Sequence, residues 1–341
     1  MPDAQPSQFQ PADLSDRTAP HARRGLPLRV GTRGSPLARV QARMFLGLLA
    51  RFCPVLAPGF NNQDVFQEHV ITTTGDAVQD RALAEIGGKG LFSKEIHEQL
   101  LDRRIDFAVH SLKDLETELP HGIVLACTLR REDARDALIV GPDTAGADAT
   151  EAFALLPPEA VIGTTSLRRQ AQLLHARPDL RITLMRGNVQ TRIDKVMRGD
   201  CAASLLAVAG LRRLGITTPY VPLDPEAMVP SAGQGIVGIT VRAEDVTLRE
   251  LLAGIEDPEA RAVSTAERAL LAALDGSCRT PIGGHARLLP DGRLHLTGLV
   301  ARPDGSFLIK RSVHGPAADA AAMGDALGCE LRADCPRDIF A

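Results

Sequence analysis

The chain has 341 residues, which is long for one compact domain and predicts two or three. Hydrophobic residues make up 44% and charged residues 24%, as is ordinary for a soluble globular protein. The formal net charge of −3 argues against a nucleic-acid carrier that depends on bulk charge. No apolar run approaches the roughly 20 residues needed to span a bilayer. The polar, Pro-rich first twenty residues lack the apolar stretch of a signal peptide, so we expect a cytoplasmic protein.

Arginine dominates the basic residues. Of 39 basic residues five are lysine, which leaves 34 arginines. A high genomic GC content would account for the bias, but guanidinium groups also bind carboxylates and phosphates in a bidentate way that ammonium groups cannot. The six cysteines include no C-x-x-C pair, and no His/Cys cluster has zinc spacing, so we expect free thiols and no metal site.

The pattern of elements begins after a disordered leader, which we predict over residues 1–26 because this stretch is Pro-rich and has no periodicity. A short strand is predicted over 28–32. Ser35 is a predicted N-cap with Pro36 as the first helical residue, because apolar residues then follow at helical spacing.

The same order of strand, polar turn and helix recurs along the chain. Apolar strands are predicted over 105–109, 161–163, 182–185 and 205–208. Alternation of this kind predicts open α/β sheets, mostly parallel. Ligands of such sheets bind beyond the carboxyl ends of the strands, where the polar turns of this sequence fall.

Two breaks and a change of pattern divide the chain. Residues 141–150 read as a linker, and residues 228–238 are a Gly-rich break. A helix then runs to about Leu274. Three strand-like runs follow near 285–289, 293–300 and 306–313, separated by Asp-Gly turns, and a final helix is predicted over about 317–332. This tail predicts a small α+β domain with an antiparallel sheet.

Five arginines lie at or within one turn of the predicted strand ends. They are Arg33, Arg168, Arg169, Arg186 and Arg192. With the hydroxyl groups of Ser35, Thr164 and Ser166 and the nearby helix N-termini, they predict a site for several carboxylates or phosphates. Spacing alone equally allows solvated arginines at helix starts. RNA binding is a further alternative, but only ten Phe, one Tyr and no Trp are available to stack on bases.

The loop after the strand at 105–109 reads Ser111-Leu112-Lys113-Asp114. A lysine beside an aspartate keeps the carboxylate ionised, and such a carboxylate can stabilise a developing cation or move protons. The alternative is a charged surface loop, and Glu116 and Glu118 follow closely enough to be confused with Asp114.

Two Gly-rich segments complete the candidates. Cys278 lies between Gly276 and Gly283-Gly284 with Arg279 beside it, a setting that exposes a thiol and favours the thiolate, whereas the other cysteines fit small buried side chains. The segment 87–90 has no G-x-x-x-x-G-K-[ST] pattern, so a Gly-hinged lid is a better interpretation than a phosphate loop.

Taken in order, several segments make the sequence resemble the porphobilinogen deaminase (hydroxymethylbilane synthase) family. They span about residues 28–341, and each is modest alone, whereas the ordered set is specific. They are Gly31-Thr32-Arg33-Gly34-Ser35-Pro36, Gly87-Gly88-Lys89-Gly90, His110-Ser111-Leu112-Lys113-Asp114, Arg131-Glu132-Asp133, Thr164-Thr165-Ser166-Leu167-Arg168-Arg169, Met185-Arg186-Gly187-Asn188, Gly233-Gln234-Gly235 and Gly276-Ser277-Cys278.

The resemblance implies two α/β domains like those of periplasmic binding proteins and a small α+β C-terminal domain with a three-stranded antiparallel sheet. Applied to this chain, it implies domain 1 over 27–134 and 236–254, domain 2 over 135–235 and domain 3 over 255–341. The chain would return to the first domain after completing the second.

The resemblance also implies the reaction. The family joins four porphobilinogen molecules head to tail into the linear tetrapyrrole hydroxymethylbilane, releases four ammonia, and starts from a dipyrromethane cofactor held by a cysteine thioether. Loss of ammonia leaves a methylene-pyrrolenine cation that one carboxylate would stabilise. By motif position Cys278 would carry the cofactor and Asp114 would be catalytic. Cofactor-binding positions match Ser111, Lys113, Thr164, Ser166, Arg168 and Arg169, and substrate-binding positions match Arg33, Ser35, Arg186 and Arg192.

The resemblance implies porphobilinogen as the small-molecule partner. It implies no nucleic acid and no membrane as partners, and it implies that the chain is a monomer. The exit of the catalytic loop departs from the family, since Leu115-Glu116 stands where many members have Val-Pro. A non-catalytic binding protein for small polycarboxylates is the second hypothesis. It would need no reactive Cys278.

Overall fold

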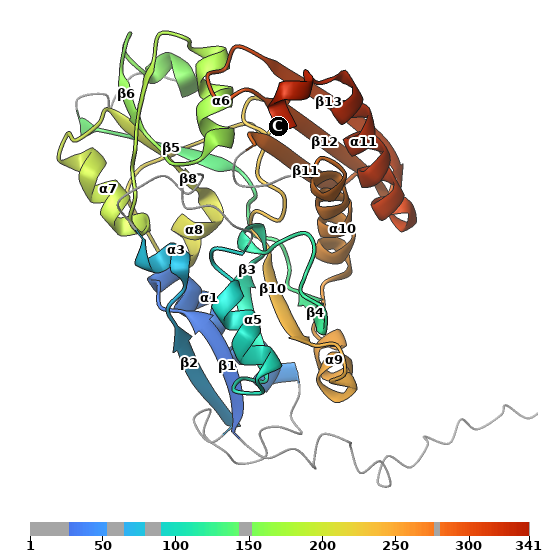
Figure 1. The fold of residues 1–341 in the computed structure, drawn as a ribbon. Helices are drawn as coiled ribbons and strands as arrows, with labels where there is room; N and C mark the ends of the chain where they lie inside the picture. The colour runs from blue at the N-terminus through green and yellow to red at the C-terminus, as the bar shows by residue number, and fades with distance from the viewer. Residues whose placement is uncertain (1–26, 53–64, 79–89, 143–151, 276–279, 341) are drawn as a thin grey trace, which may run out of the picture.

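The structure is a computed structural model and describes residues 27–52, 65–78, 90–142, 152–275 and 280–340. Three β-sheets organise these residues. In Figure 1 the first sheet lies at the bottom, the second at the upper left and the third at the upper right. The predicted leader over 1–26, most of the linker over 141–150, the predicted lid residues up to Lys89, and Cys278 all lie outside the described residues.

The first sheet gathers strands from distant parts of the chain. Its order is β2 (Phe66–Ile71), β1 (Leu28–Arg33), β3 (Phe107–Ser111), β10 (Val237–Arg242) and β4 (Ile123–Thr128). β1 is parallel to β2 and β3, whereas β10 is antiparallel to β3 and β4. Three helices pack against it: α1 (Pro36–Phe52), α5 (Lys94–Leu101) and α9 (Val246–Ala253). The single-turn helices α3 (Thr74–Ala77) and η4 (Leu112–Asp114) follow the ends of β2 and β3.

The beginning of α1 shows how the sequence builds this unit. Pro36 opens the helix as predicted, and the Ser35 hydroxyl accepts a hydrogen bond from the Ala38 backbone N–H at 3.3 Å. The buried face of α1 carries Phe45, whose ring meets Phe107 of β3 edge on at a centroid distance of 5.2 Å. The helix therefore starts at the carboxyl end of β1 and packs along the sheet.

The second sheet has the same construction. Its order is β7 (Arg181–Thr183), β6 (Val161–Gly163), β8 (Ala203–Ala207), β5 (Asp136–Val140) and β9 (Val221–Pro222). β6 is parallel to β7 and β8, and β5 is antiparallel to β8 and β9. Its helices are η6 (Ala152–Leu155), α6 (Leu167–Ala176), α7 (Val189–Met197) and α8 (Val208–Arg213). Val208, which was predicted to end a strand, instead begins α8.

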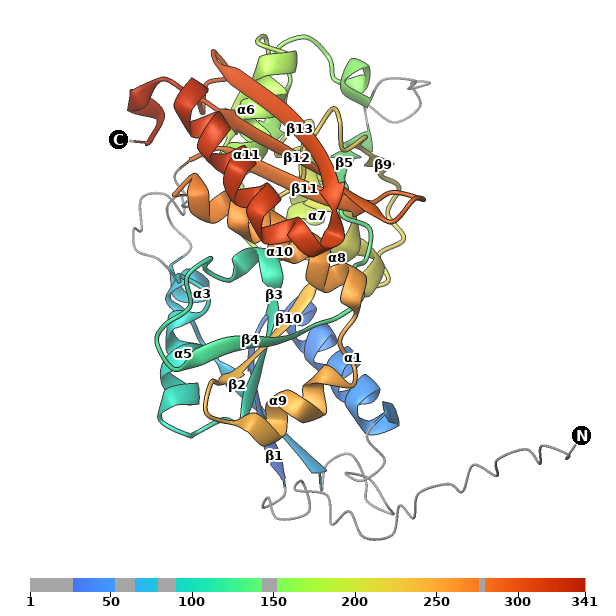
Figure 2. The ribbon, with the colours of Figure 1, turned by 90° about the vertical axis from the view of Figure 1, so that its right-hand side faces the viewer.

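The C-terminal unit is a sheet covered by two helices (Figure 2). Its elements are α10 (Pro258–Ala273), the antiparallel strands β11 (Ile282–Leu288), β12 (Arg293–Ala301) and β13 (Leu308–Pro316), the short helix η7 (Ala317–Asp319), α11 (Ala320–Asp334) and η8 (Arg337–Phe340). Helices α10 and α11 approach closely because glycine faces the contact: a Cβ at Gly324 would lie 2.2 Å from the carbonyl oxygen of Ala266. The predicted fold class, two α/β units with a small α+β unit, is confirmed.

Each five-stranded sheet is mixed: four of its strands run in one direction, in line with the prediction of mostly parallel sheets, and one strand is reversed. The antiparallel strands are β5 and β10. β5 is the first strand after the chain crosses into the second unit, and β10 is the first strand after it returns to the first unit. Each of them therefore enters its sheet against the direction of its neighbours. Periodicity could not reveal this, since a short apolar run carries no sign of its direction.

The two crossing segments lie side by side. The backbone N–H of Glu132 donates to the carbonyl of Gly235 at 3.0 Å, and the Arg131 Nε donates to the carbonyl of Gln234 at 2.8 Å. This pairing needs a glycine at 235, where φ is +87° and a Cβ would lie 2.3 Å from the Glu132 carbonyl oxygen. The outgoing and returning crossings thus form one double-stranded connection.

We expect Gly235→Ala to lower the free energy of unfolding by more than the ~1–2 kcal/mol that left-handed backbone costs a non-glycine residue, because the methyl group also meets backbone. Gly199→Ala is the matched control, since φ there is +83° and nothing lies within 4 Å of its Cβ position. Chemical denaturation of both variants measures the difference. Equal losses would show that the close packing at Gly235 is not a constraint.

Candidate active site

The predicted site residues come from both α/β units. Arg33 ends β1 and Ser111 ends β3, followed directly by Lys113 and Asp114 of η4. Thr164 and Ser166 follow β6, and Arg186 follows β7 by three residues. The two units meet near these residues: α1 of the first unit packs against α8 of the second, and Arg186 reaches the Val78 carbonyl just after α3 (Figure 1).

The catalytic-loop candidate, residues 111–117, is held along its length. The Ser111 hydroxyl donates to Gln41 Oε1 at 3.0 Å, and the Leu112 backbone N–H donates to the Ile236 carbonyl at 3.0 Å. Lys113 Nζ donates to Gln234 Oε1 at 3.2 Å. The returning crossing, residues 229–236, therefore supports the loop from one side.

Helix α10 of the C-terminal unit supports the exit of the same loop. The Arg268 guanidinium donates to the carbonyls of Glu116 at 2.6 Å and Thr117 at 3.0 Å, with a longer contact of 3.4 Å to Leu115. Burial lowers the pKa of Arg268 to about 10, with the Glu116 carboxylate acting in the opposite direction. The unusual Leu115-Glu116 exit is thus fixed by backbone contacts, which do not depend on the side chains found there.

Asp114 contacts Arg33 at the carboxyl ends of β1 and β3. Arg33 Nη1 lies 3.2 Å from Asp114 Oδ2, and Arg33 also contacts Asp76 at 2.5 Å and 3.0 Å. The guanidinium carbon lies 4.1 Å from the centroid of the Phe92 ring. Burial lowers the pKa of Arg33, but the hydrogen bond to Asp76 and the charge of Asp114 outweigh it and raise the pKa overall. Arg33 is therefore a fixed cation beside the predicted catalytic carboxylate, whose side chain is 29% exposed.

Arg168 and Arg169 begin α6 but are not solvated. Their side chains are 7% exposed, and both pair with Asp136, which is 0% exposed, at 2.8 Å and 2.7 Å respectively. They also donate to the carbonyls of Val229 and Leu205 at 2.6 Å. Burial would raise the pKa of Asp136, but the two guanidinium groups hold it well below its ordinary value. Solvated helix-start arginines are excluded here, because two buried cations share one carboxylate.

Arg186 connects the second unit to the first, whereas Arg192 contacts its own unit. Arg186 Nη2 donates to the Val78 carbonyl at 2.6 Å and contacts the Gly75 carbonyl at 3.2 Å, while Arg192 Nε donates to the Gly187 carbonyl at 2.9 Å. Burial lowers the pKa of Arg192 to about 10, aided by the charges of Arg169 and Arg186. Asp114 acts in the opposite direction, which places Arg192 within electrostatic reach of the catalytic candidate.

Lys113 lies in the same field of positive charge. Its pKa is lowered to about 8, first by desolvation and next by Arg169, while Asp114 and Asp136 act in the opposite direction. The Lys113 side chain is exposed, so solvent partly screens these charges. Lys113 and Arg192 thus both experience the positive charge of Arg169.

The predicted hydroxyl groups organise the turns. Ser35 caps α1, and the Ser166 hydroxyl accepts from the Arg169 backbone N–H at 3.4 Å. The Thr164 hydroxyl accepts from the Ser166 backbone N–H at 3.1 Å. These contacts fix the starts of two helices that point their N-termini toward the site, which adds partial positive charge.

Sequence reasoning missed several residues that hold the site together. Asp76 contacts Arg33, Asp136 joins two arginines, and Gln234 bridges to Lys113. Glu267 of α10, 0% exposed, accepts from Arg131 Nη1 at 2.6 Å and from the backbone N–H groups of Gly233 and Ala286 at 2.7 Å each. The Gly-rich pattern around Gln234 and the Arg131-Glu132-Asp133 segment were the only sequence signals.

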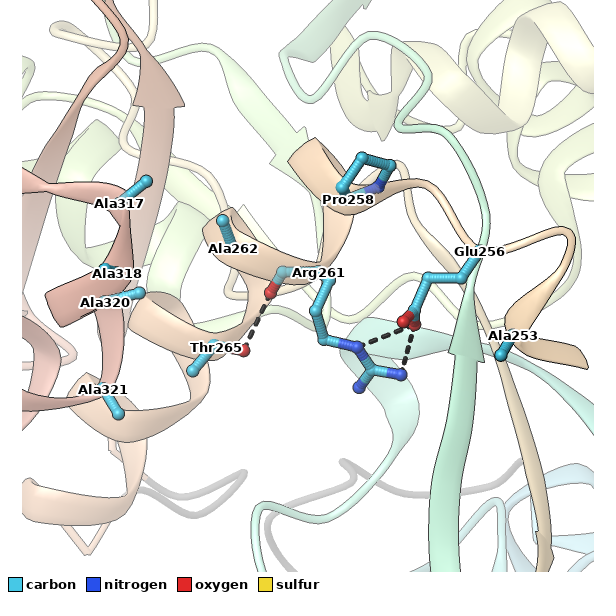
Figure 3. Close-up of a pocket in the computed structure, with 10 residues that line it drawn as sticks. All are labelled: Ala253, Glu256, Pro258, Arg261, Ala262, Thr265, Ala317, Ala318, Ala320 and Ala321. Carbon is cyan, nitrogen blue, oxygen red and sulfur yellow. Dashed lines mark hydrogen bonds and ion pairs between the residues drawn. The ribbon is translucent and has the colours of Figure 1, made fainter. Parts of the chain in front are cut away.

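A surface hollow of about 530 Å³ lies elsewhere, between the end of α9, α10 and the beginning of α11 (Figure 3). Alanines line much of it, and Arg261 is paired with Glu256 at its edge. None of its lining residues belongs to the predicted site set. In the described part of the chain no three His, Cys, Asp or Glu side chains gather as a metal site would require. Among the same residues no helix has the length and apolar character to cross a bilayer.

The geometry therefore defines a two-unit α/β protein with a cationic site at the carboxyl ends of its strands, suited to a ligand that carries several acidic groups. Comparison with known proteins identifies the family. Residues 28–250 match the family model described as porphobilinogen deaminase, dipyromethane cofactor binding domain, and residues 262–333 match porphobilinogen deaminase, C-terminal domain. The chain belongs to the porphobilinogen deaminase family.

Relatives agree over nearly the whole chain. It is 48% identical over 315 residues to the porphobilinogen deaminase of Paracoccus denitrificans, covering 92% of this chain and 96% of that one. It is 43% identical over 316 residues to the chloroplastic porphobilinogen deaminase of rice (Oryza sativa subsp. japonica), covering 92% and 85%. The predicted family and enzyme class, a transferase of tetrapyrrole biosynthesis, are confirmed, which favours the enzyme over the polycarboxylate-binding and RNA-binding alternatives.

Among solved structures, an ancestral cationic amino acid solute binding protein matches with a TM-score of 0.41 and 15% identity, covering 67% of this chain and 88% of that one.

We expect Glu267→Gln to lower the free energy of unfolding by about 3 kcal/mol, because it leaves a buried guanidinium without its counter-charge and turns an amide N–H₂ toward backbone N–H donors. Glu159→Gln is the control, since its pair with Arg181 is exposed and should contribute nothing measurable. Chemical denaturation compares the two. Equal stability of both variants would show that Glu267 does not anchor the crossings.

Proposed function

We propose that Asp114 is the catalytic carboxylate of this porphobilinogen-deaminating transferase. The observation that carries the proposal is its position beside the fixed cation of Arg33 and within the field of Arg192 and Lys113. The carboxylate therefore lies among cations that suit acidic ligands. It can stabilise the positive charge that develops on a pyrrole ring when ammonia leaves, and it can take up and return protons at the ring nitrogen.

The arginines bind the acetate and propionate groups of the pyrroles. We assign Arg33, Ser35, Arg186 and Arg192 to the substrate, and Ser111, Lys113, Thr164, Ser166, Arg168 and Arg169 to the cofactor. Desolvation first, and neighbouring guanidinium charges next, lower the pKa values of Lys113 and Arg192. Ligand carboxylates would add the negative charge that these cations lack, which supports the assignment. The residues therefore fit a dipyrromethane, which carries several carboxylates.

We propose Cys278 as the covalent anchor of the dipyrromethane. When bound, the group supplies the nucleophilic pyrrole carbon from which the product chain grows. Cys278 follows the end of α10 by five residues in the sequence, and α10 also carries Arg268, which holds the loop of Asp114. The anchor and the catalytic loop are thus both tied to one helix.

The three domains are proposed over 27–134 with 236–254, over 135–235, and over 255–341. The membership of β10 in the first sheet supports the return of the chain. We also propose a monomer, as the family resemblance implies, and a cytoplasmic location, which the free thiols of Cys127, Cys201, Cys329 and Cys335 support.

The anchor is tested by intact mass. We expect the protein, produced with ample porphobilinogen, to exceed its chain mass of 36.4 kDa by two pyrrole units. Cys278→Ser should lose this increment and the activity, whereas Cys329→Ser, at an exposed free thiol, should keep both. An unmodified wild-type mass, or an increment that survives in Cys278→Ser, contradicts the assignment.

The role of Asp114 is tested by kinetics. We expect Asp114→Asn to reduce kcat by about 100-fold or more, because an amide cannot balance a developing cation. Its mass increment should remain if the primer can still form. Glu118→Gln, an exposed carboxylate four residues further on, should keep near-normal turnover. Near-normal turnover of Asp114→Asn would remove Asp114 from this role.

A further inference from the structure

Asp136 lies at the centre of a buried polar relay that joins the two units. Its Oδ1 accepts from Arg169 Nη2 at 2.7 Å and Nε at 3.2 Å, and from Gln234 Nε2 at 2.8 Å. Its Oδ2 pairs with Arg168 Nη2 at 2.8 Å. Gln234, also 0% exposed, uses its other amide atom to accept from Lys113 Nζ. One carboxylate therefore reaches two arginines directly and Lys113 through one amide.

We propose that Asp136 is a positioning residue for the reaction: it orients the guanidinium groups of Arg168 and Arg169 and, through Gln234, presents the Lys113 ammonium to ligand carboxylates. The inference rests on the roles proposed above for these three cations. Asp136, a buried residue at the start of β5, would thus orient cations that cannot orient themselves.

The hydrogen bonds restrict what each cation can do. Arg169 directs its Nε and Nη2 groups to Asp136 and its Nη1 to the Leu205 carbonyl. These guanidinium donors are thus engaged within the protein, and Arg169 acts on ligands mainly as a fixed charge. The Gln234 amide is fixed as well, because its Nε2 also donates to the Ala134 carbonyl at 2.7 Å. With Nε2 engaged, only Oε1 remains to face Lys113.

The charges around Lys113 also support a role for Asp136. Two guanidinium groups and one carboxylate leave a net positive charge within the second unit, and Lys113 faces it. The charged groups that act on Lys113 are Arg168 and Arg169 from α6, Asp136 from β5 and Asp114 from η4. Removing the negative charge of Asp136 would make the protonated form of Lys113 less favourable, and the ammonium would be lost at a lower pH.

The pH dependence of kcat/KM tests the proposal in the primer-loaded enzyme. We expect an alkaline limb in the wild type that reports loss of the Lys113 proton, and Lys113→Met should remove that limb. Asp136→Asn should move the alkaline limb to lower pH by roughly one pH unit, the order of magnitude expected when one nearby negative charge is removed. Asp133→Asn is the matched control on the same crossing, since Asp133 pairs with Arg135 and Arg212, and its limb should stay in place.

A merely structural role would lower thermal stability or the active fraction of Asp136→Asn without moving the limb, and that result overturns the proposal. A limb that persists in Lys113→Met overturns it too. Should Asp136→Asn fail to fold, Gln234→Met tests the same connection, because it removes the amide between Asp136 and Lys113 without changing charge. It should shift the alkaline limb in the same direction by a smaller amount. An unmoved limb in Gln234→Met counts against the relay. Failure of the proposed function is distinguishable, because the wild type would then lack the primer or turnover.

Discussion

The site depends on one physical constraint, the confinement of like charges that repel one another. Arg168 and Arg169 share a single buried carboxylate, so a positive charge remains inside the second unit. That charge opposes the protonated forms of Lys113 and Arg192. A folded protein tolerates such crowding only where other interactions fix the groups, here backbone carbonyls and the Gln234 amide. Under the roles proposed above, the carboxylates of a ligand would offset this positive charge.

The same constraint decides how Asp114 differs from the other carboxylates. Asp76 takes the closer contacts of Arg33, and Asp136 is closed off within the second unit. Asp114 makes the longer contact with Arg33 and remains partly exposed. A carboxylate that is held in place but incompletely paired can respond to a charge that appears during the reaction, whereas a fully paired one would first have to give up its partner. Of these three carboxylates, Asp114 is thus the least tightly paired.

Sequence patterns located the outer part of this arrangement. Strand ends followed by helix starts placed Arg33, Ser35, Thr164 and Ser166 correctly at the ends of β1 and β6, and the resemblance to a family supplied the role of Asp114. The supporting residues were beyond reach. Asp136 opens an apolar strand and Glu267 lies in an ordinary amphipathic helix, so nothing local distinguishes them from surface acids. Their partners are brought near only by the two chain crossings, and the direction of β5 and β10 after those crossings is equally invisible to periodicity.

Helix α10 links the C-terminal unit to the loop of Asp114 and to the chain crossings. Consecutive residues of a helix point about 100° apart, so Glu267 reaches the paired crossings while Arg268 reaches the loop of Asp114. The C-terminal unit is therefore attached both to the catalytic loop and to the connection between the two α/β units. The second unit is attached to the C-terminal unit as well, because Gln170 and His175 of α6 contact the carbonyls of Pro303 and Gly305.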